Sequence, residues 1–230
     1  MKERGMIFNA DMVRAILDGR KTQTRRIMKP QPEPCPRGGH WWPSNVFKTM
    51  LHVEDEMQNG KGGWGGLVGD ACPFGDVGDR IWVREAFASG LSTKSTLAYR
   101  ATHKREDLED GFYDTIKWTP SIHMPRWASR ILLEITSVRV ERLNAISEED
   151  AQSEGVHTEV WDQTVVARNY AAIDEFFQFW SEDMPHYVEM NQLYRSSFRS
   201  LWESIYGAEN WLANPWVWVI EFKRVEGGAA

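Results

Sequence analysis

Three segments of this chain place large apolar side chains at every second position, and they constrain its fold more than any other feature. They are residues 79–85, 130–142 and 216–223, and in the last of them Trp216 and Ile220 fall on one face. Successive side chains of a β-strand point to opposite faces, so this period is typical of half-buried strands. The segments therefore predict a twisted sheet or a small barrel.

Other parts of the chain have the apolar spacing and end signals of helices. Helices are expected over residues 10–18, 147–154, 171–181 and 189–206. Asn9 and Ser147 are good helix N-caps, and Gly19 and Gly155 are typical residues for the left-handed turn after a helix. Strands and helices together indicate an α+β protein.

Composition favours one domain spanning residues 1–230. A chain of 230 residues that is 42% hydrophobic can bury one substantial core. Residues 30–77 are rich in proline and glycine, and we expect them to form a long loop without regular structure. The two cysteines, Cys35 and Cys72, do not imply a disulfide framework, and a zinc site with His40 is a less favoured alternative.

Charge and hydropathy indicate where the protein acts. The first residues lack the apolar core of a signal peptide, and no segment has the ~18 apolar residues of a membrane helix, so a cytoplasmic protein without membrane contact is expected. The net charge is −6, yet residues 1–30 hold eight Lys and Arg against three Asp and Glu. This basic end could face a phosphate group.

The octapeptide from Gly19 to Arg26 has the pattern of a functional site. Gly19, Lys21, Thr24 and Arg26 follow one another at fixed intervals directly after the first expected helix. A chain that leaves a glycine C-cap can turn sharply, so Lys21 and Thr24 could project toward a common point. Each residue alone would more often be an ordinary surface or turn residue, and the combination carries the prediction.

These four residues match the G-x-K-x-x-T-x-R signature of the ASCH superfamily, and the chain resembles the longer ASCH proteins of bacteriophages and prophages. The resemblance extends to residues 6–9, 78–85, 121–127 and 214–222. It implies a PUA-like, mainly-β pseudo-barrel with surrounding helices, and a link to RNA metabolism. The segments at about 30–77 and 157–190 fall outside the resemblance and are expected to be insertions.

Glu154 is the second notable position, because it lies in the last turn of the helix expected over residues 147–154. The helix dipole disfavours a carboxylate there, which suits a group that exchanges protons near neutrality, although a solvated surface glutamate is the more ordinary interpretation. The segment from Leu143 to Glu154 also resembles the small bacterial ASCH amidohydrolases that deacetylate 4-acetylcytidine. That resemblance implies catalytic roles for Lys21, Thr24 and Glu154.

The implied reaction is hydrolysis of an amide. Lys21 could act as a base only if burial, or the like charges of Arg20, Arg25 and Arg26, lowered its pKa. The Thr24 hydroxyl, or a water molecule, would attack the acyl carbon, and Glu154 would protonate the departing amine. Arg26 is better suited to orienting the substrate or stabilising an oxyanion.

Substrate-binding positions are expected at Gly19, Arg26, Arg80, Trp82, Arg84 and His123. Arg80, Trp82 and Arg84 lie on one strand face, where the tryptophan could stack on a base and the arginines could hold a phosphate, although arginine stems also cover tryptophan in ordinary packing. A structural role is an equally compatible interpretation of His123. No GxSxG, GxxxxGK[ST], HExxH or GxGxxG motif occurs, and no cofactor or metal is expected. Two functions remain: an amidohydrolase acting on an N-acylated cytidine or related nucleoside, and a noncatalytic RNA-binding module.

Overall fold

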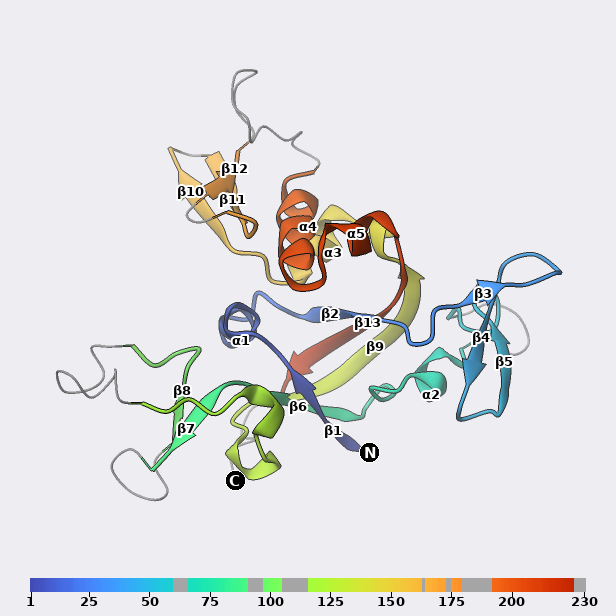
Figure 1. Cartoon of the computed structure of the whole chain (residues 1–230), viewed down its shortest axis with the longest axis horizontal. Helices are drawn as coiled ribbons and strands as arrows, with labels where there is room; N and C mark the ends of the chain where they lie inside the picture. Colours follow the sequence, from blue (N-terminus) through green and yellow to red (C-terminus); the bar gives the residue numbers. More distant parts are fainter. Residues whose placement is uncertain are drawn as a thin grey trace.

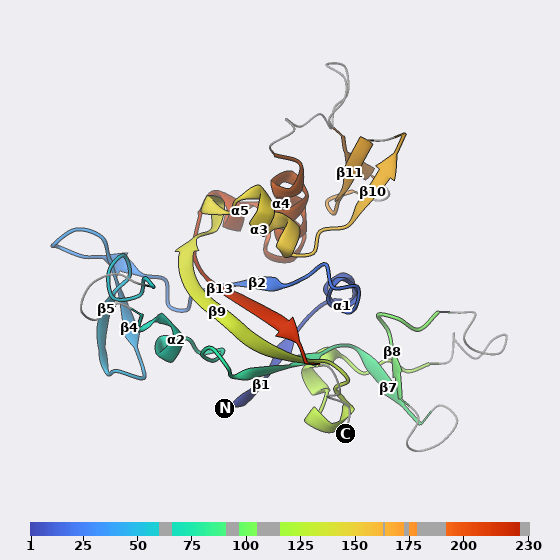
Figure 2. The same ribbon diagram turned by 180° about the vertical axis from the view of Figure 1, so that it is seen from behind.

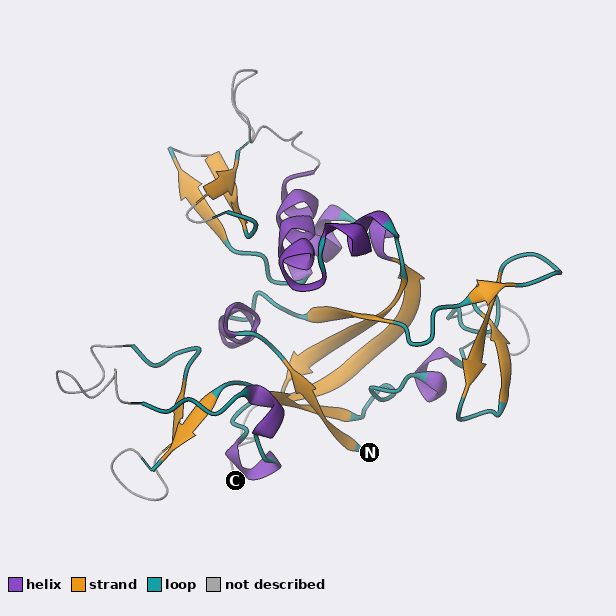
Figure 3. Ribbon diagram, in the orientation of Figure 1, coloured by secondary structure: helices purple, strands orange, loops and turns teal. Residues whose placement is uncertain are grey.

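The computed structural model describes residues 1–59, 66–90, 97–104, 116–162, 164–172, 175–178 and 192–225. Within this part the protein is α+β, with most of its regular structure in strands (Figure 3). The strands form one five-stranded sheet and three smaller ones. The expected fold class is therefore confirmed at the level of α+β.

The five-stranded sheet has the order β1-β6-β9-β13-β2 (Figure 1). Its strands are β1 (Glu3–Ile7), β6 (Arg80–Arg84), β9 (Leu132–Arg142), β13 (Trp216–Arg224) and β2 (Gln23–Ile27). β1 and β6 are parallel, and the other neighbours are antiparallel. The three segments predicted from their two-residue period are β6, β9 and β13, so these predictions are confirmed.

The main hydrophobic core lies on one face of this sheet. Ile81, Leu133, Trp218 and Ile220 are buried there, as the alternation predicted. The sheet is strongly curved (Figure 1). A side chain of one edge strand reaches the other, because Nη2 of Arg26 in β2 donates a hydrogen bond to the carbonyl oxygen of Ile7 in β1, at 2.7 Å.

Helices lie on both sides of β2 (Figures 1 and 2). α1 (Ala10–Leu17) follows β1, whereas α3 (Glu148–Ser153), α4 (Leu193–Tyr206) and α5 (Ala208–Leu212) form one group on the other face. The predicted N-caps are confirmed, because Asn9 and Ser147 accept hydrogen bonds from the backbone N–H groups of Met12 and Asp150.

The predicted loop over residues 30–77 is wrong, because much of it has regular structure. It holds β3 (Glu33–Pro34), β4 (His40–Ser44), β5 (Thr49–His52) and the short helix α2 (Val68–Ala71). Trp42 and Leu51 bury their side chains in the main core, and Trp42 packs edge-on against Trp218, with ring centroids 5.3 Å apart. This tertiary burial outweighs the local preference of a segment rich in proline and glycine.

The helix predicted over residues 171–181 is also wrong where that segment is described. It contains β12 (Glu175–Phe177), which pairs with β11 (Thr164–Asn169), and β11 pairs with β10 (Thr158–Trp161). Residues 173, 174 and 179–181 of the predicted helix lie outside the described residues. A further hairpin joins β7 (Phe87–Ser89) and β8 (Leu97–Tyr99).

Cys35 and Cys72 are both buried free thiols, as expected. Among the described residues, no group of three or more His, Cys, Asp or Glu side chains is placed to hold a metal ion, so the alternative zinc site is not formed there. His40 instead lies 2.6 Å from a carboxylate oxygen of Glu54. No helix in the described ranges is long and apolar enough to cross a membrane.

Candidate functional site

The site forms where the chain leaves α1 and meets the end of α3. Gly19 adopts a positive φ of 76°, as expected of the glycine that ends a helix, and the N–H of Lys21 then donates to the carbonyl of Ala15 at 3.0 Å. Glu154 is the C-cap of α3, followed by Gly155 with a φ of 83°. Lys21 and Glu154 form an isolated β-bridge, which brings together two residues 133 positions apart.

Lys21 and Glu154 form a buried ion pair. Nζ of Lys21 lies 2.7 Å from Oε2 of Glu154, and also donates to the Glu154 carbonyl at 2.8 Å. The side chains are 0% and 2% exposed. Burial lowers the pKa of Lys21 below its ordinary value of 10.5, although the attraction of Glu154 acts in the opposite direction.

The expected causes of this pKa shift are partly corrected. Arg26 and Arg25 lower the pKa of Lys21 further, but less than burial does. The guanidinium of Arg20, in contrast, is paired with Asp18 at 3.0 Å, which offsets its charge, and it donates to the carbonyl of Gly155.

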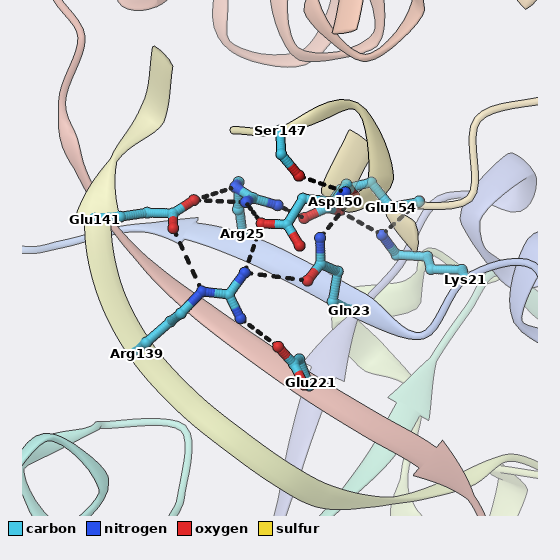
Figure 4. A network of polar contacts seen from close by, with 9 residues as sticks. All are labelled: Lys21, Gln23, Arg25, Arg139, Glu141, Ser147, Asp150, Glu154 and Glu221. Atoms are coloured by element: carbon cyan, nitrogen blue, oxygen red, sulfur yellow. Dashed lines mark hydrogen bonds and ion pairs between the residues drawn. The ribbon is translucent and has the colours of Figure 1, made fainter. Parts of the chain in front are cut away.

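Arg25 is a central residue of the site, although the sequence indicated only an effect of its charge on Lys21 (Figure 4). Its buried guanidinium donates to Oε1 of Glu154 at 3.0 Å, to Glu141 at 2.5 Å and to Asp150 at 2.7 Å. Glu154 therefore has two cationic partners, one on each carboxylate oxygen. The signal that could have found Arg25 is the alternation along β2, which places Arg25 and Gln23 on the face opposite Thr24.

The ion pairs continue along the sheet to Arg139 (Figure 4). Arg139 donates to Asp150 at 2.6 Å and also pairs with Glu141 and Glu221. Burial opposes ionisation of Asp150, yet its hydrogen bonds with Arg25 and Arg139 hold its pKa below the ordinary value. This network fixes the face of β2 and β13 beneath α3.

Thr24 and Arg26 lie on the other face of β2, toward the main core. The guanidinium of Arg26 lies 5.2 Å from the ring centroid of Phe8. Thr24 is buried, and none of the hydrogen bonds in the described part of the chain joins its hydroxyl to Lys21. The two faces meet at the free edge of β2, where Thr24, Arg26 and Glu154 line one small cavity.

This cavity is about 10 Å³ in volume, which is room for about one water molecule. Side chains of α4 close it: Phe198, Leu201, Trp202, Ile205 and Tyr206. A cavity of about 280 Å³ lies beside Gly155, between α1 and the β10–β11 hairpin, and its walls include Arg20, Arg168 and Tyr170. The catalytic positions predicted from the sequence are thus enclosed, whereas an open, polar cavity lies next to them.

The remaining predicted substrate-binding residues form a separate group. Arg80, Trp82 and Arg84 lie on the outward face of β6, and the guanidinium of Arg84 lies 5.4 Å from the Trp82 ring centroid. Exposed His123 ends a short 3₁₀ turn, which Arg84 joins through a hydrogen bond to the Ile122 carbonyl. No contact in the described ranges joins this group to Lys21 or Glu154, and Gly19 contributes a turn rather than a side chain.

The sequence matches no protein-family model, no curated protein and no solved structure.

Proposed function

We propose that the chain is an ASCH-type domain with a PUA-like pseudo-barrel and that residues 30–77 and 157–190 are insertions in it. The G-x-K-x-x-T-x-R motif supports the family, and the strong curvature of the sheet supports the barrel (Figure 1). The bond between Arg26 and Ile7, which joins the two edge strands, supports it as well. A cytoplasmic location belongs to the same proposal, supported by the free thiols of Cys35 and Cys72.

We further propose that the protein is an amidohydrolase that removes an acyl group from the exocyclic amine of an N-acylated cytidine or a related nucleoside. The observation that carries this proposal is the buried contact of 2.7 Å between Lys21 and Glu154, with the pKa of Lys21 lowered. A site that only holds phosphate gains nothing from a carboxylate on its lysine. Amide hydrolysis, in contrast, needs a base and a proton donor side by side.

In the proposed reaction, neutral Lys21 accepts the proton of the attacking hydroxyl. The nucleophile is the Thr24 hydroxyl, or the single water molecule that the cavity beside Thr24 can hold. Glu154 passes the proton taken up by Lys21 to the departing amine, so that the C–N bond breaks and the free cytosine amine leaves. Attack by water gives the carboxylic acid directly, whereas attack by Thr24 leaves an acyl ester on its side-chain oxygen, and a water molecule activated by Glu154 then hydrolyses that ester to the acid. Arg26 lines the same cavity and is placed to orient the substrate.

The small cavity beside Thr24 must open before this reaction can take place. A nucleoside needs far more space than about 10 Å³, so the α4 side chains over Thr24 must move outward before substrate enters. Ile205 and Tyr206 are suited to this movement, because they lie in the last turn of α4 and are 44% and 37% exposed. Binding of the substrate is then coupled to outward movement of these α4 side chains.

The test is incubation of the purified protein with 4-acetylcytidine, with chromatography to follow the release of cytidine. Thr24→Val keeps the shape of a buried side chain and should abolish turnover by a hydroxyl nucleophile without unfolding the protein. Thr22→Val is the matched control, because Thr22 is exposed and only two residues away. Full activity in Thr24→Val would assign the attack to water, and no release by the wild type, across several 4-acylcytidines, would contradict the hydrolase.

A noncatalytic RNA-binding module is the second candidate, and the outward face of β6 favours it. There, Arg84 stacks on Trp82 and Arg80 lies on the same side of the strand. If the hydrolase test fails, binding of RNA measured against salt concentration is the next experiment.

A further inference from the structure

In the part of the chain that the structure describes, Arg26 and Arg84 belong to the minority of arginines that form no ion pair with a carboxylate. Arg14, Arg20 and Arg25 each bind a carboxylate within 3.0 Å. In the described ranges, Arg26 and Arg84 contact only neutral groups: the Ile7 and Ile122 carbonyls and the rings of Phe8 and Trp82. The Nε atoms of both are buried and donate no hydrogen bond.

Nearby carboxylates do not neutralise these two cations, because other arginines bind them. Glu85, the neighbour of Arg84, lies 2.9 Å from Arg130. Glu3, on the same face of β1, lies 2.9 Å from Arg126. Two desolvated N–H donors on two unpaired guanidinium groups are unfavourable in an empty site and favourable around a bound anion.

Both side chains lie against the same strand. Arg26 reaches the carbonyl of Ile7, and Ile7 is also the register partner of Arg84. The Arg84 side chain then runs over Gly5, where a Cβ atom would come within 2.9 Å of its Cδ. Gly5 and Ile7 are two residues apart in β1, so these contact points are separated by on the order of 7 Å.

The same Arg26 lines the cavity of Thr24 and Glu154. An anion held by Arg26 and Arg84 would therefore sit at the rim of the proposed catalytic cavity. The large cavity beside Gly155 is a weaker anion site, because its arginines Arg14, Arg20 and Arg168 each lie within 3.8 Å of a carboxylate oxygen of Asp11 or Asp18.

We propose that Arg26 and Arg84 form a phosphate site, and that the substrate is an acylated cytidine that carries a phosphate group rather than the free nucleoside. This inference rests on the proposed function for the reaction, but the site itself is a claim about binding. The phosphate could be that of a mononucleotide or that of an RNA backbone. Guanidinium groups bind either through charge-assisted hydrogen bonds.

The binding test compares cytidine, cytidine 5′-monophosphate and a short oligocytidylate RNA by calorimetry at fixed salt. The phosphate-bearing ligands should bind at least about tenfold more tightly than cytidine, and Arg84→Gln should remove that difference. Arg126→Gln is the matched control, because Arg126 already has Glu3 as its partner. If Arg84→Gln weakened the binding of the oligocytidylate but not that of cytidine 5′-monophosphate, an RNA backbone would be the source of the phosphate.

The kinetic test uses 4-acetylcytidine and its 5′-monophosphate. In Arg84→Gln, kcat/KM should fall at least about tenfold more for the monophosphate than for the nucleoside. If the ligands with a phosphate bound more tightly than cytidine but no substrate were hydrolysed, the proposed phosphate site would be supported and the proposed amidohydrolase activity would be contradicted. Equal binding of all three ligands by the wild type and Arg84→Gln would overturn the phosphate site, whatever the outcome for hydrolysis.

Discussion

The buried pair of Lys21 and Glu154 predicts an unusual order of stabilities among three variants. Glu154→Gln leaves Lys21 fully buried without the carboxylate that lies 2.7 Å from its Nζ. Removing one partner of a buried pair costs about 3–5 kcal/mol. Lys21→Met should cost less, about 1–3 kcal/mol, because Glu154 keeps its contact of 3.0 Å with Arg25.

The double variant Lys21→Met/Glu154→Gln carries the decisive result. It removes the buried ammonium together with its partner, so it should be more stable than Glu154→Gln alone by about 2 kcal/mol. Adding a second substitution would thus restore stability. Urea denaturation of the wild type and the three variants, followed by circular dichroism at pH 7, measures the four free energies of unfolding.

Additive costs would refute this reasoning. If the double variant lost the sum of the two single losses, Lys21 and Glu154 would not be coupled, and the ion pair would not exist in solution. A matched control is Arg199→Met/Glu203→Gln, which removes an ion pair of 2.8 Å on the outside of α4, where Arg199 is 51% exposed. That pair should show a coupling of less than about 1 kcal/mol.

Three further predictions concern the same site. Folding lowers the pKa of Lys21, so the unfolded chain binds more protons than the folded protein between that pKa and 10.5. The free energy of unfolding should therefore rise with pH over that window, and Lys21→Met should remove this contribution. If the variant showed the same slope of unfolding free energy against pH as the wild type, the pKa shift would be contradicted. Gly155→Ala should lower the free energy of unfolding by on the order of 3 kcal/mol in urea titrations, because its Cβ would come within 2.6 Å of Cβ of Lys21 at a φ of 83°. Gly19→Ala, with a φ of 76° and no atom within 4 Å, should cost only about 1–2 kcal/mol, and equal losses would argue against the close packing. Tyr206→Ala should enlarge the entrance to the cavity and raise kcat/KM more for long 4-acyl groups than for acetyl, and an unchanged ratio would show that α4 does not restrict access.

The central strands could be predicted because their local pattern and their final environment agree. β9 buries one set of alternate side chains in the main core, so its period of two records the burial directly, whereas β13 buries Trp218 and Ile220 there and Val217 and Val219 in a second cluster on its other face, which matches its continuous apolar run. Residues 30–77 could not be predicted in this way. The order of that segment depends on Trp42, whose partner Trp218 lies 176 positions further along the chain, and no local pattern contains such a contact.

The candidate site was predictable only in part for a similar reason. The cap signals at Gly19 and Gly155 correctly placed Lys21 after one helix and Glu154 at the end of another. Nothing in those two signals specifies that the helix ends meet, and the pairing was implied only by the family resemblance. Arg25 was expected only to lower the pKa of Lys21 through its charge, and its direct contact with Glu154 was not predicted, because a strand sends Arg25 to the face opposite Thr24 and Arg26.

Arg25 also explains how a lysine beside a carboxylate can have a lowered pKa. If Lys21 were the sole partner of Glu154, loss of its proton would leave a buried anion uncompensated, and the pair would hold that proton firmly. Arg25 contacts the other oxygen of Glu154 at 3.0 Å and stays charged throughout the physiological range. Glu154 therefore remains paired when Lys21 becomes neutral, and the full burial of Lys21 can lower its pKa. For the proposed hydrolase, this arrangement makes Lys21 available as a base in its resting contact with Glu154. Exchanging Arg25 for a neutral residue should consequently raise the pH at which activity appears in a pH–rate profile, because the loss of a neighbouring positive charge and the loss of the second partner of Glu154 both favour the protonated lysine.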